Sequence, residues 1–253
     1  MSRLSRVRSE ARAAYTSFVR RRTAVFFTFF FPVLLIAIFA GLISTGGGGT
    51  GLFSQPPGYY VPAYLAVVVL FTPLSRVSSE VARHREGARF EKLATTPLEK
   101  WEWLFAQTLV NVALIAAASV LLLLALLAAG ASFALSPWFV VFVPAVSVVF
   151  CGVGAVLGSL ADSQDGAIAA SNGVAIPLLF LSDTFLSPAA LPDWFAPVMN
   201  LSPLTYFARG VRAATYSGAT PGWPGSVTAE FAVLLALAVA AFAVGAALIP
   251  WTE

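Results

Sequence analysis

The sequence has very few of the side chains from which metal and redox sites are built. Its 253 residues include one cysteine, Cys151, and one histidine, His84. One of each cannot form an intramolecular disulfide, a zinc site of His and Cys ligands, or a pair of haem ligands. We therefore expect no metal and no cofactor on this chain. Cys151 is expected to serve in packing, and His84 to be a solvated side chain of a loop.

Charged side chains are also scarce, at 11% of the chain, whereas hydrophobic residues make up 58% and the mean hydropathy is +0.84. Soluble domains contain roughly a quarter charged residues, so the composition predicts an integral membrane protein. Six apolar stretches approach or exceed the roughly 20 residues that a spanning helix needs. They are residues 24–44, 60–80, 104–129, 137–160, 167–187 and 227–250. Because these runs are continuously apolar rather than alternating, we predict one all-α transmembrane domain of six spans over residues 1–253.

Lysine and arginine are distributed very unevenly along the chain. Residues 1–22 and 76–103 hold thirteen of the fifteen. Positive residues close to spans remain on the cytoplasmic side, so both segments are expected there. With six spans, the N- and C-termini are then both cytoplasmic.

Residues 1–22 have two interpretations. They form either an amphipathic helix on anionic headgroups or a helix that also leans on a partner protein. Nucleic acid is excluded as a partner, because the basic residues flank a span and no binding fold accompanies them.

The segment of residues 188–216 is too rich in proline for a straight span and too apolar for a free loop. Short re-entrant helices between spans five and six, on the outer side, fit this composition. Arg209 and Arg212 are expected on an amphipathic helix at the outer headgroup layer. Its lipid-facing side chains would be Tyr206, Phe207 and Tyr216.

Polar residues inside apolar stretches are candidates for a transport pathway. Gln107, Asn111 and Asn172 either line such a pathway or make hydrogen bonds between helices. Asp183 lies in the outer part of the fifth stretch and is expected at the interface rather than buried.

Catalytic patterns are missing from the sequence. The glycine run at residues 46–51 lacks the Lys and Ser/Thr of a phosphate-binding loop, so it is interpreted as a flexible connection and the chain is not expected to hydrolyse ATP. The spans contain no paired acids, no histidine cluster and no Ser/Lys dyad, so the sequence does not indicate an enzyme.

Small residues and prolines predict local features of the spans. Gly154 and Gly158, with Gly152 nearby, predict close approach of two helix backbones. Pro32 and Pro177 each lie inside an apolar stretch and are expected to kink it.

The charged segment of residues 83–103 interrupts this apolar chain. It reads RHREGARFEKLATTPLEKWEW. After Pro97, an amphipathic helix is expected with Leu98, Trp101 and Phe105 on one side. Without further information, the segment is either a solvated charged loop or a surface for a soluble partner.

Three separated motifs resemble the type-2 permeases of ABC transporters. Residues 29–43 are similar to the opening helix of that family with its central proline. The charged segment resembles its R-E-x-G-T-x-E-x-L-x-x-T-P pattern followed by Trp; the matching residues are Arg85, Glu86, Glu91, Leu93, Thr96, Pro97 and Trp101. The third motif resembles F-x-P-x-x-x-L-P-x-W, then N-P-L-T-Y, then R. Its matching residues are Phe185, Pro188, Leu191, Pro192, Trp194, Pro203, Leu204, Thr205, Tyr206 and Arg212.

The chain departs from these motifs at three places. Ala88 stands where the family loop usually has Gly, so the break before the loop helix is expected to be shifted. Ser182 and Asp183 replace a Ser-Gly pair, and Ser202 with Pro203 replaces Asn-Pro.

The resemblance implies a permease subunit of an ATP-driven exporter in the cell membrane. Thirteen Arg against two Lys, with abundant Ala, indicate a prokaryotic plasma membrane. ATP and magnesium would be bound by a separate ABC ATP-binding subunit, and a second permease copy would complete the substrate path. Residues 83–103 would be the coupling loop, with Glu86, Glu91, Glu99 and Glu102 meeting basic groups of the ATPase. The outer gate would comprise Asp183, Phe185, Pro188, Pro192, Trp194, Pro203, Tyr206 and Arg212. A channel or a membrane scaffold without an ATPase remains the alternative.

Overall fold

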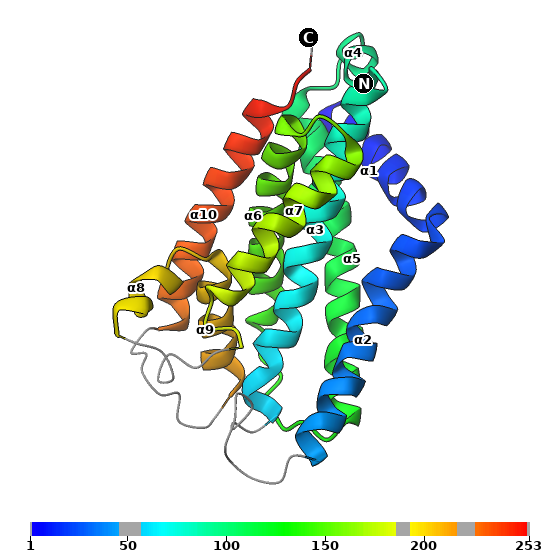
Figure 1. Cartoon of the computed structure of the whole chain (residues 1–253). Helices are drawn as coiled ribbons and strands as arrows, with labels where there is room; N and C mark the ends of the chain where they lie inside the picture. Colours follow the sequence, from blue (N-terminus) through cyan, green and yellow to red (C-terminus); the bar gives the residue numbers. More distant parts are fainter. Residues whose placement is uncertain (1, 46–56, 186–192, 217–225, 252–253) are drawn as a thin grey trace.

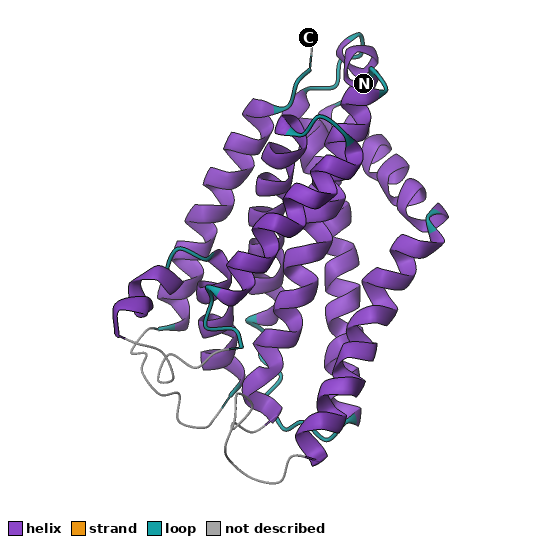
Figure 2. Cartoon of the chain, in the orientation of Figure 1, coloured by secondary structure: helices purple, strands orange, loops and turns teal. Residues whose placement is uncertain are grey.

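The computed structural model describes residues 2–45, 57–185, 193–216 and 226–251, which contain helices and no strands (Figures 1 and 2). The longer helices are α1 (Arg3–Arg20), α2 (Arg22–Thr45), α3 (Val61–Glu86), α5 (Lys100–Ala128), α6 (Phe139–Leu160), α7 (Gln164–Phe180), α9 (Pro203–Thr215) and α10 (Val227–Leu248). The short ones are η1 (Pro57–Tyr60), α4 (Arg89–Ala94), η3 (Asp193–Phe195) and α8 (Ala196–Met199). The all-α prediction is confirmed for these residues.

Every predicted apolar stretch contains a long helix. By length and composition, four helical segments of the described chain can cross a membrane: Gly58–Glu86, Lys100–Ala128, Phe139–Leu160 and Val227–Leu248. The other two stretches contain α2 and the 17-residue α7. Pro32 and Pro177 lie inside α2 and α7 respectively.

Several helix boundaries differ from the apolar runs that predicted them, and two of them have a local explanation. α3 continues through Arg83 and Arg85 to Glu86, and basic residues in a last turn interact favourably with the helix dipole. α7 begins earlier than its apolar run, at Gln164, because the Ser163 hydroxyl accepts a hydrogen bond from the Gly166 N–H and caps the helix. Apolar runs therefore locate these helices but not their ends.

Both marked chain ends lie at one end of the bundle, which we call the terminal end (Figure 1). α4 lies at the terminal end, whereas α8 and α9 lie towards the opposite end. α1 packs against α5 and meets α2 at a bend on the edge of the bundle. This arrangement places the loop between α3 and α5 at the terminal end.

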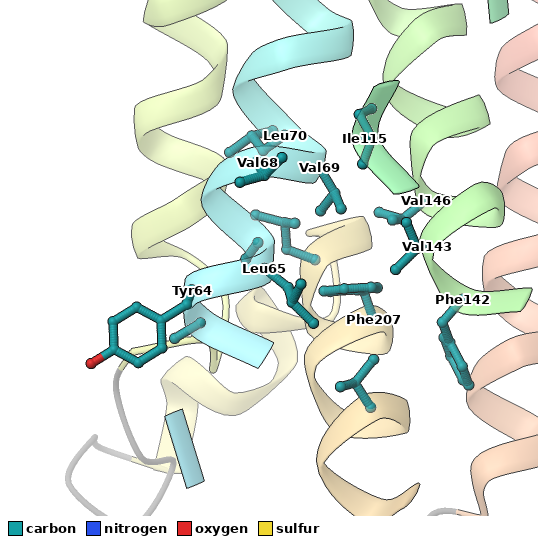
Figure 3. Packing of buried hydrophobic residues seen from close by; sticks show 14 of the residues in the cluster. Tyr64, Leu65, Val68, Val69, Leu70, Ile115, Phe142, Val143, Val146 and Phe207 are labelled. Carbon is teal, nitrogen blue, oxygen red and sulfur yellow. The ribbon is translucent and has the colours of Figure 1, made fainter. Parts of the chain in front are cut away.

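The core forms where α3 and α6 cross the centre of the bundle. α6 packs against α10 and α3, and α3 also packs against α7, α5 and α9. Fully buried side chains such as Leu65 of α3, Phe142 of α6 and Phe207 of α9 fill the space between them (Figure 3). α9 is thus part of the core, held between α3, α6 and α10.

Glycines bring the backbone of α6 into contact with both of its neighbours. A Cβ atom at Gly152 would overlap the backbone of Ala241 in α10. A Cβ atom at Gly154 or Gly158 would overlap the carbonyl oxygens of Leu74 or Ser78 in α3. The predicted close approach of helix backbones at these glycines is confirmed.

Candidate functional site

The loop between α3 and α5 reverses the chain at the terminal end. α3 ends at Glu86, Ala88 adopts a left-handed conformation with φ 48°, and α4 follows at once. Ala88 is the only non-glycine residue with positive φ in the described chain. The break before the loop helix therefore stays at the position where the family usually has Gly, and the expected shift is wrong.

Replacing Ala88 with glycine is expected to stabilise the protein. A left-handed alanine costs roughly 1–2 kcal/mol, and the greater flexibility of unfolded glycine offsets roughly 0.5–1 kcal/mol of the gain. The net gain of about 1 kcal/mol should raise the apparent Tm of the purified protein. Ala13→Gly, at an exposed position inside α1, is the control and should lower it. An unchanged or lower Tm for Ala88→Gly would contradict the strained loop.

The loop rests on a cluster of aromatic rings. The Phe90 ring lies 5.2 Å from His84, 5.1 Å from Trp103 and 5.5 Å from Trp251, measured between centroids. His84 is buried in the last turn of α3, and its Nδ1 lies 2.8 Å from the Glu80 carbonyl oxygen. The expectation of a solvated His84 is therefore wrong. Helix α3 continues beyond the apolar run to include His84, and Phe90 of the following loop packs against the His84 ring.

The expected amphipathic face after Pro97 is only partly correct. Leu98 is buried, but Trp101 and Phe105 are exposed, at 38% and 41%. The buried aromatic side chain of this turn is Trp103. The assignment failed because Trp101 and Phe105 belong to α5, and the sequence alone does not show which side of α5 packs against α1.

Five of the predicted coupling residues form an exposed surface. We call Glu86, Glu91, Thr96, Pro97 and Trp101 the loop surface. The Trp101 Nε1–H donates a hydrogen bond of 2.6 Å to Glu99, and Glu86 accepts one of 2.7 Å from the backbone N–H of Gln164.

The other two predicted coupling residues are less accessible. Arg85 and Leu93 are half-buried, and the Arg85 Nη1 donates to the Ser159 carbonyl oxygen at 2.7 Å. These two residues hold the loop against the bundle, while the loop surface remains available for contact.

Glu102 does not belong to the loop surface. Its carboxylate is fully buried and accepts two hydrogen bonds from Arg6 of α1, at 2.9 and 2.5 Å. It also accepts the backbone N–H of Glu99 in a capping box that starts α5. The expected contact between Glu102 and a partner is therefore wrong, because the carboxylate is already bound by Arg6 of α1.

α1 is fixed to α5 along its buried face. Ala14 and Phe18 of α1 pack with Val110 and Leu114 of α5. The exposed basic residues of α1, which are Arg3, Arg8, Arg12 and Arg20, consequently project from a helix that is already docked on its own chain.

The predicted pathway amides separate into two groups. Gln107 and Asn111 are buried under α1; the Gln107 Nε2 donates to Glu10 at 3.3 Å, and the Asn111 Nδ2 donates to the Gln107 carbonyl at 2.9 Å. Burial raises the pKa of the Glu10 carboxyl. Asn172 is exposed and lines a groove instead. The first two therefore make internal hydrogen bonds, and Asn172 alone faces open space.

The groove has a volume of about 900 Å³ and lies between α2, α3 and α7. Phenylalanines form much of its wall, with Phe27 and Phe31 from α2 and Phe71 from α3. Arg21 and Arg76 also line it, towards the terminal end of α3. We call this space the phenylalanine groove.

At the opposite end, buried charges join α7 to α9. The Arg209 Nε donates to the Asp183 carboxylate at 2.7 Å, and Arg212 Nη1 lies 3.7 Å from the same oxygen. Arg212 also donates to the Asp183 carbonyl at 3.0 Å and lies over the Tyr59 ring at 4.2 Å. Arg209 donates in addition to Asn200 at 2.8 Å.

These positions correct two expectations. Asp183 is 2% exposed rather than interfacial, and Arg209 and Arg212 are buried rather than at a headgroup layer. Phe207 faces the core and not lipid. The sequence misled because each of these charges, taken separately, is read as solvent-exposed, whereas in the structure both arginines pair with one acid that lies 26 residues or more away in the chain.

The sequence of the whole region matches a known family. A family model described as ABC-2 type transporter covers residues 7–216. The chain belongs to this family. Comparison with curated proteins gave no match.

Membership of the ABC-2 type transporter family makes the chain the membrane component of a transporter, as the three motifs predicted. The matched residues contain the loop surface, the phenylalanine groove and the buried charges of Asp183, Arg209 and Arg212. α10 begins beyond the match.

The remaining predicted gate residues of this ABC-2 chain are spread around the opposite end. Phe185 is half-buried, Trp194 is 70% exposed, and Pro203 begins α9. The Tyr206 hydroxyl donates to the Asn200 carbonyl oxygen at 2.9 Å. Pro188 and Pro192 lie outside the described residues. Within the described ranges, no three His, Cys, Asp or Glu side chains gather to hold a metal ion.

Sequence reasoning missed Arg76 as a site residue. Arg76 lies inside the second apolar stretch, where it counts only as one of the positive residues that indicate the cytoplasmic side. An ionisable residue within a span is by itself a signal of function, so the groove arginine was accessible from the sequence.

Proposed function

We propose that this chain is the permease subunit of an ATP-driven ABC exporter in a prokaryotic plasma membrane. Six helices, α2, α3, α5, α6, α7 and α10, cross the bilayer. Both termini and the loop surface face the cytoplasm. The short helices η3 and α8, together with α9, form a re-entrant segment on the outer side. ATP and magnesium are bound by a separate ATP-binding subunit.

The loop surface is the observation that carries this proposal. Two acids and Trp101 stay exposed, although the residues beneath them are anchored by the Phe90 and Trp103 rings and by the capping box. An exposed aromatic side chain beside charges on a rigid base is typical of a protein contact. A channel or scaffold that acts without an ATPase has no need to couple this surface to hydrolysis.

A second copy of the permease completes the substrate path. The phenylalanine groove runs along the side of one chain and is open between α2 and α7. A second groove facing it would enclose a path between two copies, and tilting of the helices would open that path alternately to either side.

Replacing Trp101 with alanine is expected to weaken coupling to the ATPase. The loss of one well-buried interface aromatic costs at least about 2 kcal/mol, so stimulation of the ATP-binding subunit should fall roughly thirtyfold at a limiting permease concentration. The measurement is ATP hydrolysis by the purified ATP-binding subunit as permease is added.

Phe180→Ala is the control, since Phe180 is an exposed aromatic side chain at the end of α7, outside both the loop surface and the predicted gate. It should leave the stimulation unchanged. Equal stimulation by Trp101→Ala and the unaltered chain would remove the coupling role of the loop surface. An ATP-binding subunit that neither copurifies nor responds would favour the channel or scaffold.

A further inference from the structure

The phenylalanine groove contains a half-buried positive charge, Arg76, that forms no ion pair with a carboxylate of the described residues. Arg76 donates from Nη2 to the Ala14 carbonyl oxygen at 3.3 Å, and its guanidinium lies 5.5 Å from the Phe18 ring centroid. Its other terminal nitrogen, Nη1, is buried and has no hydrogen-bond acceptor in the described part of the chain. A buried donor without an acceptor costs roughly 1–3 kcal/mol, so this position favours an acceptor supplied from outside the chain.

The acids Glu80 and Glu10 are already engaged by other groups. Glu80, on α3 itself, pairs with Arg83 and with Arg21, whose Nη2 lies 3.5 Å from the Glu80 carboxylate. Glu10 receives the Gln107 amide. Three arginines thus meet two acids here, and no ion pair joins Arg76 to a carboxylate among the described residues. The terminal end of the groove therefore keeps an excess positive charge.

The rest of the groove is uncharged and largely apolar. Phe27, Phe31, Val67 and Phe71 line it, and the polar lining residues are uncharged apart from the two arginines. The volume of about 900 Å³ lies within the range of roughly 300–1,000 Å³ found for small-molecule sites. A ligand that satisfies both parts of this surface has one anionic end and a long apolar body.

We propose that the phenylalanine groove binds amphiphilic anions as cargo, with the phosphate or carboxylate head at Arg76 and the apolar body along the phenylalanines. This inference rests on the proposed function, because only a transporter moves what its groove binds. Arg21, which also lines this end, strengthens the attraction for the head. Cationic amphiphiles are repelled by the same two arginines.

The test compares three probes that share a dodecyl chain: dodecyl phosphate, dodecyl maltoside and dodecyltrimethylammonium. Each is titrated in radiolabelled form onto the full chain in phosphatidylcholine nanodiscs, with empty nanodiscs subtracted. Dodecyl phosphate should bind roughly 10- to 100-fold more tightly than the other two, as one charge-assisted hydrogen bond predicts. Equal binding of the three probes would overturn the proposal.

Three variants locate the binding. Arg76→Gln should reduce the affinity for dodecyl phosphate to that for dodecyl maltoside, whereas Arg8→Gln, which removes the same charge from the exposed face of α1, should not. Val67→Trp fills the groove without altering a charge and should weaken all three probes. Val67→Trp therefore tests whether the probes bind in the groove even where Arg76→Gln does not fold. An equal loss in Arg8→Gln and Arg76→Gln would make the attraction a general surface effect and overturn the site.

A last arm separates cargo from a resident bilayer lipid. In proteoliposomes with the ATP-binding subunit, ATP should drive dodecyl phosphate across the membrane. Phosphatidylglycerol that displaces the probe but is not moved by ATP would make the occupant a bilayer lipid and overturn the cargo assignment. ATP-driven movement without selectivity for the anion contradicts this inference alone. Selective binding without ATP-driven movement of any probe contradicts the proposed function.

Discussion

Replacing Gly158 with leucine is expected to leave almost no folded protein. Even a Cβ atom at this position would overlap the Ser78 carbonyl oxygen and crowd Val81 of α3. One overpacked methylene costs roughly 1–3 kcal/mol, and here the obstacle is backbone that cannot rotate away. Separating α6 from α3 would also open the centre of the core.

The yield of monodisperse protein after extraction in detergent is the measurement. Gly173→Leu is the matched control, because Gly173 lies in helix α7 and a Cβ there meets nothing within 4 Å. It should fold normally and even gain slightly from the better helix propensity of leucine. Normal yields for both variants would show that α6 and α3 are not in backbone contact.

The change Asp183→Asn should destabilise the protein by about 3–5 kcal/mol, since two buried positive charges would lose the carboxylate that they share. The shape of the side chain is kept, so the loss reports charge rather than packing. The apparent Tm of the purified protein measures it. Asp162→Asn, at a fully exposed acid, should have almost no effect.

A double variant checks that Asp183 acts through Arg209. Asp183→Asn combined with Arg209→Gln removes one charge of each sign, and it should be less destabilised than the sum of the two single variants. Strict additivity would mean that the two side chains do not interact.

Local patterns were sufficient where a feature depends on one helix. The apolar stretches located α2, α3, α5, α6, α7 and α10, and the glycines of α6 predicted its backbone contacts, because span length and the absence of a side chain are properties of the sequence itself. The loop motif likewise placed Glu86, Glu91 and Trp101 on an exposed surface.

Features that depend on a second helix could not be predicted in this way. The sequence predicts Glu102 as an exposed acid of the loop, whereas in the structure it pairs with Arg6, which lies 96 residues earlier in the chain. The sequence predicts Arg209 and Arg212 at the membrane surface, whereas in the structure both are buried beside Asp183. In each case the cost of burying a charge is offset by a partner distant in sequence, and single-sequence patterns carry no record of such pairs.

The Arg6–Glu102 pair also connects the loop to the helices that border the phenylalanine groove. Glu102 sits in the first turn of α5, next to the loop surface, and Arg6 belongs to α1, which is followed by α2 after the single residue Arg21. The buried pair therefore links the start of α5 to α1, and the one-residue connection links α1 to α2, whose Phe27 and Phe31 form a wall of the phenylalanine groove.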